Sequence, residues 1–158
     1  MPWNIEDGFD LEAFLARPLV ARLATAGRRG PRVRPLWYLW EEGAFWWLTG
    51  PWSRLARDLA DDPRVSLVVD VTDVATGEVK GVTATGEAEI VPFDPDRAKR
   101  KLARYLGPAD TLWDPRFRSS WDMAARTGSD EDPDGLGRLV PRTLRAGDSS
   151  FKVVRTES

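Results

Sequence analysis

The chain has 158 residues, with no cysteine and no histidine, and its 23 lysines and arginines nearly balance 25 aspartates and glutamates. The length predicts a single domain over residues 1–158, which can bury a core without disulfides or metals. The missing residue types exclude the usual zinc sites and Cys–His or Ser–His–Asp catalysis, so no metal site is assigned, although an oxygen-only Mg or Ca site stays open.

The charge balance and the N-terminal sequence limit the partners that we expect. A net charge of −2 argues against a general nucleic-acid-binding protein, which would present a basic face. Residues 1–7 lack the basic and apolar segments of a signal peptide, and no apolar run reaches membrane-spanning length. We therefore expect a cytoplasmic protein that binds neither nucleic acid nor a membrane.

The first third of the chain reads as one short helix followed by three strands. Asp10 is an expected N-cap for a helix that Pro18 ends, and apolar residues alternate with other residues in the segment that follows. The expected elements are a helix over Leu11–Arg17, strands over Leu19–Thr25, Arg32–Trp40 and Ala44–Thr49, a turn at 27–31 and a hairpin loop at 41–43.

The middle of the chain predicts two helices around two strands. Ser53 is an expected N-cap for a helix with Leu55, Ala56 and Leu59 on its apolar stripe, and Asp94 caps another helix that ends at Gly107. Strands are expected over Arg64–Val71 and Val79–Val91, joined by a loop over 72–78. Gly86, in the middle of the second strand, indicates a bulge or a close approach of another segment.

The last third is less regular. Trp113, Phe117 and Trp121 share one helical face within 111–127, and the acidic segment 128–135 reads as a solvated loop rather than a cation site. A strand is expected over Leu139–Ala146, with Pro141 placing it at a sheet edge or bulge, and a short strand over Phe151–Val154.

Eight tryptophans stand out, and five of them lie between Trp37 and Trp52. Because an indole carries a large apolar area, the simplest interpretation is packing in the core and in a dimer interface. The alternative is that one or two of them flank a planar ligand.

The order of several short motifs resembles the pyridoxamine 5'-phosphate oxidase-like family. The order and spacing of these motifs together carry the resemblance, which covers about Leu11 to Ala146. The matching segments are Phe14–Thr25, Arg32–Tyr38, Leu48–Gly50 with Ser53-Arg54, Asp62–Val65, Gly86-Glu87-Ala88 within Gly81–Ile90, and Arg138–Pro141.

This resemblance implies a mainly β fold, a split β-barrel with a few short helices. It further implies a homodimer with two cofactor sites at the subunit interface. Members of the family bind FMN or the deazaflavin coenzyme F-420, and some bind haem or have lost activity, so the fold alone does not specify the chemistry.

A flavin tail ends in a phosphate, and the residues around Ser53 suit such an anion. The turn from Thr49 and Gly50 to Ser53 leads into a helix N-terminus, which offers amide donors and the positive end of the helix dipole. Arg54 and Arg57 add guanidinium charge, and Arg34 could reach the same anion. The alternative is that Arg54 and Arg57 are only solvated surface residues.

The same resemblance places the isoalloxazine ring against the backbone of Arg34, Pro35, Leu36 and Trp37. Since the cofactor supplies the hydride chemistry, no catalytic residue is assigned. Two departures from the family pattern matter: many members carry a lysine where this chain has Leu55, and true pyridoxamine phosphate oxidases use a histidine that this chain lacks.

Two functions stay open on this basis. The first is an FMN- or F-420-dependent oxidoreductase that transfers hydride to or from a small molecule. The second is a non-catalytic flavin carrier or an empty-cleft dimer of the same fold. The Thr49-Gly50 turn and the arginines favour the first, whereas Leu55 favours the second.

Overall fold

The computed structural model describes residues 3–50, 53–117 and 135–154. The strands are β1 (Trp3–Ile5), β2 (Val20–Gly27), β3 (Gly30–Trp37), β4 (Leu39–Glu41), β5 (Ala44–Thr49), β6 (Arg64–Asp73), β7 (Glu78–Pro92), β8 (Gly135–Leu139) and β9 (Thr143–Asp148). The helices are α1 (Leu11–Leu15), α2 (Arg54–Asp61), α3 (Pro95–Leu106) and the 3-10 turn η1 (Asp110–Leu112).

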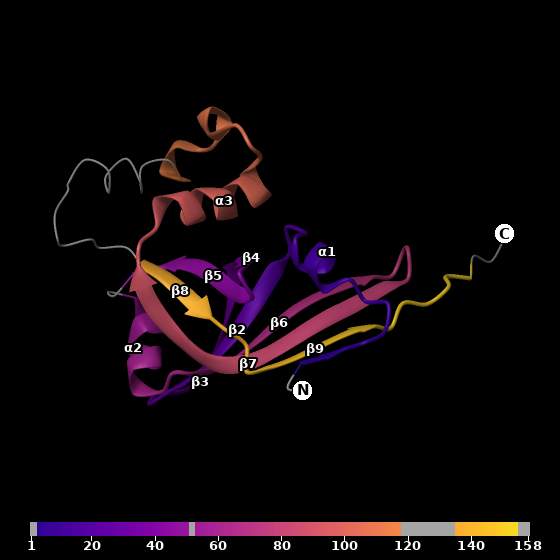
Figure 1. Cartoon of the computed structure of the whole chain (residues 1–158), viewed down its shortest axis with the longest axis horizontal. Coiled ribbons are helices and arrows are strands. Elements are labelled where there is room, and N and C mark those ends of the chain that lie inside the picture. Colours follow the sequence, from indigo (N-terminus) through magenta and orange to yellow (C-terminus); the bar gives the residue numbers. More distant parts are fainter. Residues whose placement is uncertain (1–2, 51–52, 118–134, 155–158) are drawn as a thin grey trace.

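One long strand connects two parts of a mostly antiparallel sheet. The strands follow the order β3-β2-β6-β7-β8-β5-β4, and β9 pairs with both β7 and β1. The first half of β7 pairs with β6 and β9, and its last residues, Ala88–Pro92, pair with β8. Figure 1 shows β7 curving along the molecule, with α2 at one end and the β6–β7 hairpin projecting at the other. The mainly β class with a few short helices is confirmed.

Gly86, in the middle of β7, has the close approach that the sequence indicated. A Cβ atom at this position would lie 2.9 Å from the Leu139 Cδ1 atom and 3.0 Å from the Val140 carbonyl oxygen. Just beyond the bend, the Ala88 amide donates to the Pro63 carbonyl at 2.8 Å. Glycine is therefore required where the segment between β8 and β9 passes close to β7, and the pairing register shifts by one residue there, from Ala88–Leu139 to Thr85–Thr143.

The core lies between the two parts of the sheet. Its largest fully buried side chains include Trp47, Tyr38 and Phe45, and α1 contributes Phe14 and Leu15. A smaller cluster forms where α3 covers β4, β5 and β8. That cluster comprises Leu39, Ala44, Trp46, Ala98 and Leu136. Trp40, Trp46 and Trp47 are each at most 8% exposed, so these indoles pack within one protomer and do not form an exposed dimer patch.

The three expected helix caps are confirmed. The Asp10 carboxylate accepts a hydrogen bond from the Ala13 amide, and the Ser53 hydroxyl accepts one from the Ala56 amide, both at 3.0 Å. The Asp94 carboxylate accepts from the first-turn amides of α3, and α3 ends at Gly107, with a φ of 94°. Each cap satisfies amides that have no acceptor within their own helix.

The strand predicted over Arg32–Trp40 is wrong in its continuity, because it breaks at Tyr38. The Tyr38 amide donates to the Tyr105 hydroxyl at 3.0 Å, and the Tyr38 carbonyl accepts from the Arg104 guanidinium. Since both backbone groups bind side chains of α3, Tyr38 has none left for a strand ladder. The chain therefore ends β3 at Trp37 and starts β4 at Leu39.

Two predictions near the C-terminus also need correction. The strand expected over Leu139–Ala146 is two strands, β8 and β9, interrupted around Pro141, where the sequence indicated an edge or bulge. Phe151–Val154 is not a strand, although the Phe151 amide donates to the Gly77 carbonyl at 2.9 Å. In addition, the unpredicted β1 pairs in parallel with β9.

Some sequence predictions fall outside the described residues. These concern Pro51 and Trp52 in the turn before α2, Trp121 in the segment 111–127, and the acidic residues of 128–134. Within the described part, Trp113 is buried, with its indole donating to the Gly107 carbonyl at 2.8 Å. The helices in that part are all too short or too polar to cross a membrane.

Gly86→Ala tests the close approach of the segment between β8 and β9. The added methyl group would press on the Val140 carbonyl, so we expect the free energy of unfolding to fall by about 1–3 kcal/mol, as for other overpacked sites. Gly81→Ala in the same strand is the matched control, because its nearest contact would be an ordinary 3.8 Å to the Asp70 Cβ atom. Urea unfolding measures both variants, and equal stabilities would contradict the close approach.

Candidate functional site

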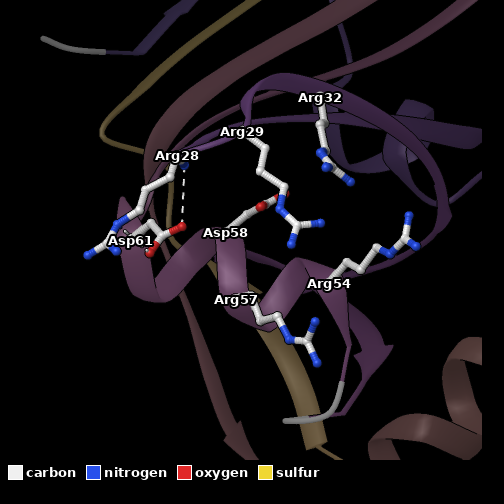
Figure 2. Close-up of a pocket in the computed structure, with 7 residues that line it drawn as sticks. All are labelled: Arg28, Arg29, Arg32, Arg54, Arg57, Asp58 and Asp61. Atoms are coloured by element: carbon white, nitrogen blue, oxygen red, sulfur yellow. Dashed lines mark hydrogen bonds and ion pairs between the residues drawn. The ribbon is translucent and has the colours of Figure 1, made fainter.

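A pocket of about 320 Å³ opens between the β2–β3 hairpin and α2 (Figure 2). Arginines dominate its lining. The lining residues are Arg28, Arg29, Arg32, Arg54, Arg57, Asp58 and Asp61. The volume lies at the lower end of the range for small-molecule sites.

The hairpin supplies the first wall of this pocket. β2 and β3 pair without a break from Val20–Trp37 to Gly27–Gly30, so only Arg28 and Arg29 form the turn. Gly30 has a φ of 98°, which glycine adopts without strain. Side chains alternate along β3, so Arg32 projects on the same face as Arg34, toward α2.

The helix supplies the second wall. Leu55 and Leu59 are 5% and 8% exposed and pack into the main core. The opposite stripe, at positions 54, 57, 58 and 61, has the i, i+3, i+4, i+7 spacing of one helix face and lines the pocket. Leu55 is therefore committed to the core, and the cation that many family members carry at this position has no counterpart here.

A buried ion pair joins the two walls. The Arg34 guanidinium donates to the Asp58 carboxylate at 2.5 Å and to the Thr25 hydroxyl at 2.9 Å, and that hydroxyl donates to Asp58 at 3.1 Å. The hydrogen bond from Arg34 lowers the pKa of Asp58 despite the opposing effect of burial, and the Thr25 bond adds to the lowering. A Cβ atom at Gly27 would lie 2.5 Å from the Asp58 Oδ1 atom, so glycine lets the helix approach this closely.

The second aspartate is also neutralised. The Arg28 amide donates to the Asp61 Oδ2 atom at 3.3 Å, and the Arg28 Nε atom lies 3.4 Å from the Asp61 Oδ1 atom. In contrast, the side chains of Arg29, Arg32, Arg54 and Arg57 have no hydrogen-bond or ion-pair partner within the ranges that the structure describes. The pocket therefore holds an uncompensated positive charge and favours an anion.

The structure separates the expected site residues into two groups. Arg54 and Arg57 line the pocket, whereas Thr49 and Ser53 do not. The Thr49 and Ser53 hydroxyls lie 3.1 Å apart and share a hydrogen bond. Gly50 is buried and accepts a hydrogen bond from the Ser53 amide at 3.0 Å. Arg34 sits beside the pocket, bound to Asp58, and is not one of its lining residues.

The second group lies farther along β3. Pro35 is exposed on one face of the strand, and Leu36 packs against the core from the other face. The Trp37 indole stacks on the Tyr105 ring, with centroids 4.5 Å apart and planes 7° from parallel. The Tyr105 hydroxyl donates to the Leu19 carbonyl at 2.7 Å, so this stack is anchored to the barrel.

Five pocket residues were not among the expected site residues: Arg28, Arg29, Arg32, Asp58 and Asp61. The sequence did contain a signal for Arg32, because it lies two residues from Arg34 on a strand and must share its face. No local signal indicated that the Arg28-Arg29 turn would lie against the C-terminal end of α2.

Comparisons with known proteins give one family and a shared fold. A model of the family described as "Pyridoxamine 5'-phosphate oxidase" matches residues 10–128. A conserved hypothetical protein from Mycobacterium tuberculosis is 27% identical with a TM-score of 0.66, covering 92% of this chain and 89% of that one. No curated protein matches the chain by sequence.

Two further solved structures share the fold. A FAD-binding protein from Mesorhizobium loti is 24% identical, with a TM-score of 0.57 and coverage of 88% of this chain and 92% of that one. An F420 reductase is 23% identical, with a TM-score of 0.58 and coverage of 87% and 96%.

Asp58→Asn tests the pair that joins the walls. It leaves Arg34 buried without its counter-charge, so we expect the free energy of unfolding to fall by about 3–5 kcal/mol. Asp70→Asn is the matched control, since it removes a half-exposed pair with Arg22 and should cost less than about 1 kcal/mol. Chemical denaturation at pH 7 measures both, and similar losses would contradict a structural role for Asp58.

The pH dependence of the protein's stability also tests the Arg34–Asp58 pair. The folded-state pKa of Asp58 lies below its value of about 3.9 in an unfolded chain. The stabilisation is therefore complete above that pH and is lost as the pH falls through the folded-state pKa. We expect the stability of the wild type to fall more steeply with acid than that of Asp58→Asn.

Proposed function

Because the chain belongs to the pyridoxamine 5'-phosphate oxidase family, we propose that it is a flavin-dependent oxidoreductase acting on a small molecule. Its cofactor is FMN or the deazaflavin coenzyme F-420, held at the interface of a homodimer. The observation that carries this proposal is the pocket between the hairpin and α2, where four guanidiniums lack partners among the described residues.

The pocket residues fit the anionic tail of such a cofactor. Arg32 and Arg54 come from opposite walls, and guanidiniums bind phosphate oxygens in a bidentate manner. The N-terminus of α2, capped by Ser53, adds the positive end of its dipole on the same side. Arg34 acts on this site indirectly, because it pairs with the Asp58 carboxylate in the pocket lining and offsets that negative charge.

The ring of the cofactor would lie along the second half of β3. Pro31 and Pro35 carry no amide hydrogen, which suits a strand at the end of the sheet order. The anchored Trp37–Tyr105 stack gives a rigid aromatic wall at the end of this strand. The bound flavin or deazaflavin supplies the hydride chemistry, while these residues position it and limit water access.

A second protomer would complete the ring site. Val33 is 67% exposed and Val20 is 37% exposed, and both lie on the outward faces of β3 and β2 near this wall. Val20 pairs with Trp37 and Val33 with Ala24 across the two strands, and exposed apolar positions gathered on one face are typical of an interface. This face, rather than the buried tryptophans of the β4–β5 hairpin, is the proposed contact between subunits.

One observation favours a second candidate, a non-catalytic flavin carrier or empty-cleft dimer. The position that carries a lysine in many family members is Leu55, and its side chain is buried in the core. The visible absorption spectrum of the purified protein separates the candidates, since it distinguishes FMN, deazaflavin, haem and an empty protein.

Titration with FMN and with coenzyme F-420 tests cofactor binding. We expect saturable quenching of tryptophan fluorescence, because Trp37 lies next to the proposed ring site. Arg54→Ala should weaken binding roughly tenfold to hundredfold, the loss for one hydrogen bond to a charged group. The control is Arg145→Ala, an exposed arginine on β9. Absence of saturable quenching with both cofactors would refute the flavin-binding function.

Light scattering tests the dimer. We expect a dimer at micromolar concentration, and Val33→Lys should shift it toward the monomer because a charge would be buried at the contact. Val74→Lys is the matched control, since Val74 is 78% exposed at the projecting β6–β7 hairpin. A monomeric wild type, or equal effects of the two variants, would count against the proposed interface.

A further inference from the structure

We propose that Lys101 is a modification site for carbon dioxide, and that its side-chain amine takes up CO2 to form a carbamate. Lys101 lies in the middle of α3 and is 5% exposed, and together with Ala98 and Leu102 it forms the buried face of this helix. The inference goes beyond the proposed function, because it involves neither the arginine pocket nor a cofactor.

The amine of Lys101 has no anionic partner in the part of the chain that the structure describes. It makes no hydrogen bond and no ion pair there, whereas the Lys99 amine on the same helix lies 2.9 Å from the Asp110 carboxylate. Burial without a counter-charge disfavours the protonated amine and lowers the pKa of Lys101 to about 8. Roughly a tenth of this amine is therefore neutral at pH 7, against less than about a thousandth for an ordinary lysine, and only the neutral form is nucleophilic.

Arg104 makes an anion on the Lys101 nitrogen favourable. It lies one helical turn further along α3 and pairs with no carboxylate among the described residues. Its guanidinium donates instead to three backbone carbonyls, those of Leu15, Arg17 and Tyr38. The nearby phenols of Tyr38 and Tyr105 stay uncharged, because burial raises the pKa of both. Lys101 and Arg104 are thus neighbouring cations without a counter-charge, and a carbamate would reverse the charge of one of them.

Arg97 offers a second donor on the same side of the helix. Four residues separate it from Lys101, so the two side chains are neighbours on α3. Its Nη1 atom is enclosed and has no hydrogen bond, although the guanidinium lies within ion-pair distance of three carboxylates. Those carboxylates belong to Glu41, Glu42 and Asp94. A carbamate on Lys101 would give this enclosed donor an acceptor.

The surroundings of Lys101 favour a small electrophile. In carbamate formation the nitrogen lone pair forms a bond to the carbon of CO2, one C–O π pair moves onto oxygen, and a proton passes from nitrogen to solvent. Lys101 lines neither the arginine pocket nor three further surface concavities, which argues against a bulky aldehyde or acyl donor. Its nitrogen is not one of the fully enclosed, unbonded nitrogens of the described residues, so a small gas can reach it.

Isotopically labelled CO2 tests the inference on the full chain. The protein is equilibrated with labelled bicarbonate near neutral pH, carbamates are trapped as ethyl esters with a trialkyloxonium salt, and the modified lysine is located by mass spectrometry. We expect label at Lys101 that saturates with CO2. Lys99 is the internal control, because Asp110 raises its pKa and keeps it protonated. No label at Lys101, or equal label at both lysines, would overturn the inference.

The pH dependence of labelling separates Lys101 from an ordinary surface amine. At a constant concentration of dissolved CO2, the label at Lys101 should rise as the pH increases toward about 8, since its neutral fraction grows there. A label that appears only near pH 10, where an unperturbed lysine loses its proton, would show that Lys101 is not the reactive amine proposed.

Variants test the role of the neighbouring charges. Lys101→Met keeps an unbranched side chain and should lose the label. Arg97→Gln should raise the CO2 concentration for half-maximal labelling about tenfold, the loss for one hydrogen bond to a charged group. Arg100→Gln is the matched control, because Arg100 also pairs with Glu41 but is half-exposed on α3. Equal effects of Arg97→Gln and Arg100→Gln would contradict the assigned donor, and persistent label in Lys101→Met would refute the site. The result does not depend on whether the protein binds a flavin.

Discussion

The arrangement of the site depends on the buried contact of Arg34 with Asp58 and Thr25. A charged pair removed from water is stabilising only when its geometry and additional hydrogen bonds offset desolvation, and the Thr25 hydroxyl supplies both a donor and an acceptor here. The contact fixes α2 against the hairpin, at a distance that only glycine at position 27 permits. It also pairs Asp58, a carboxylate of the pocket lining, with Arg34, which offsets the negative charge of Asp58.

Those remaining arginines make the pocket a place where function and stability oppose each other. Like charges around a small cavity repel, and the apolar stripe of Leu55 and Leu59 must hold α2 in place against that repulsion. An anion in the pocket reverses the sign of this electrostatic energy. The folded protein should therefore gain stability from any ligand that the arginines bind, by the linkage between binding and folding.

Local signals predicted most of the fold. The caps Asp10, Ser53 and Asp94 and the alternation in β2, β6 and β7 depend on neighbours in sequence, and the structure has each of them. The errors arose where distant groups compete for the backbone. β3 stops before Tyr38 because two side chains of α3 bind its amide and carbonyl. β1 escaped prediction because its partner β9 lies about 140 residues away.

In the candidate site too, local sequence features predicted some residues, whereas the roles of others depend on contacts between distant segments. Arg54 and Arg57 were predicted from a helix start, a local feature, whereas the choice between Arg32 and Arg34 depended on how α2 crosses the hairpin. Strand alternation puts both on one face, and only the position of Asp58 commits Arg34 to an ion pair and leaves Arg32 to the pocket. Leu55 also shows that one position does not decide the charge of the site. The lysine that many family members carry is absent at this position, which suggested weaker anion binding, but an anion responds to the summed electrostatic field of all the charges around the cavity. Arg29 and Arg32 add positive charge from the opposite wall, so charge at such a site is better judged by the whole cavity than by one aligned position.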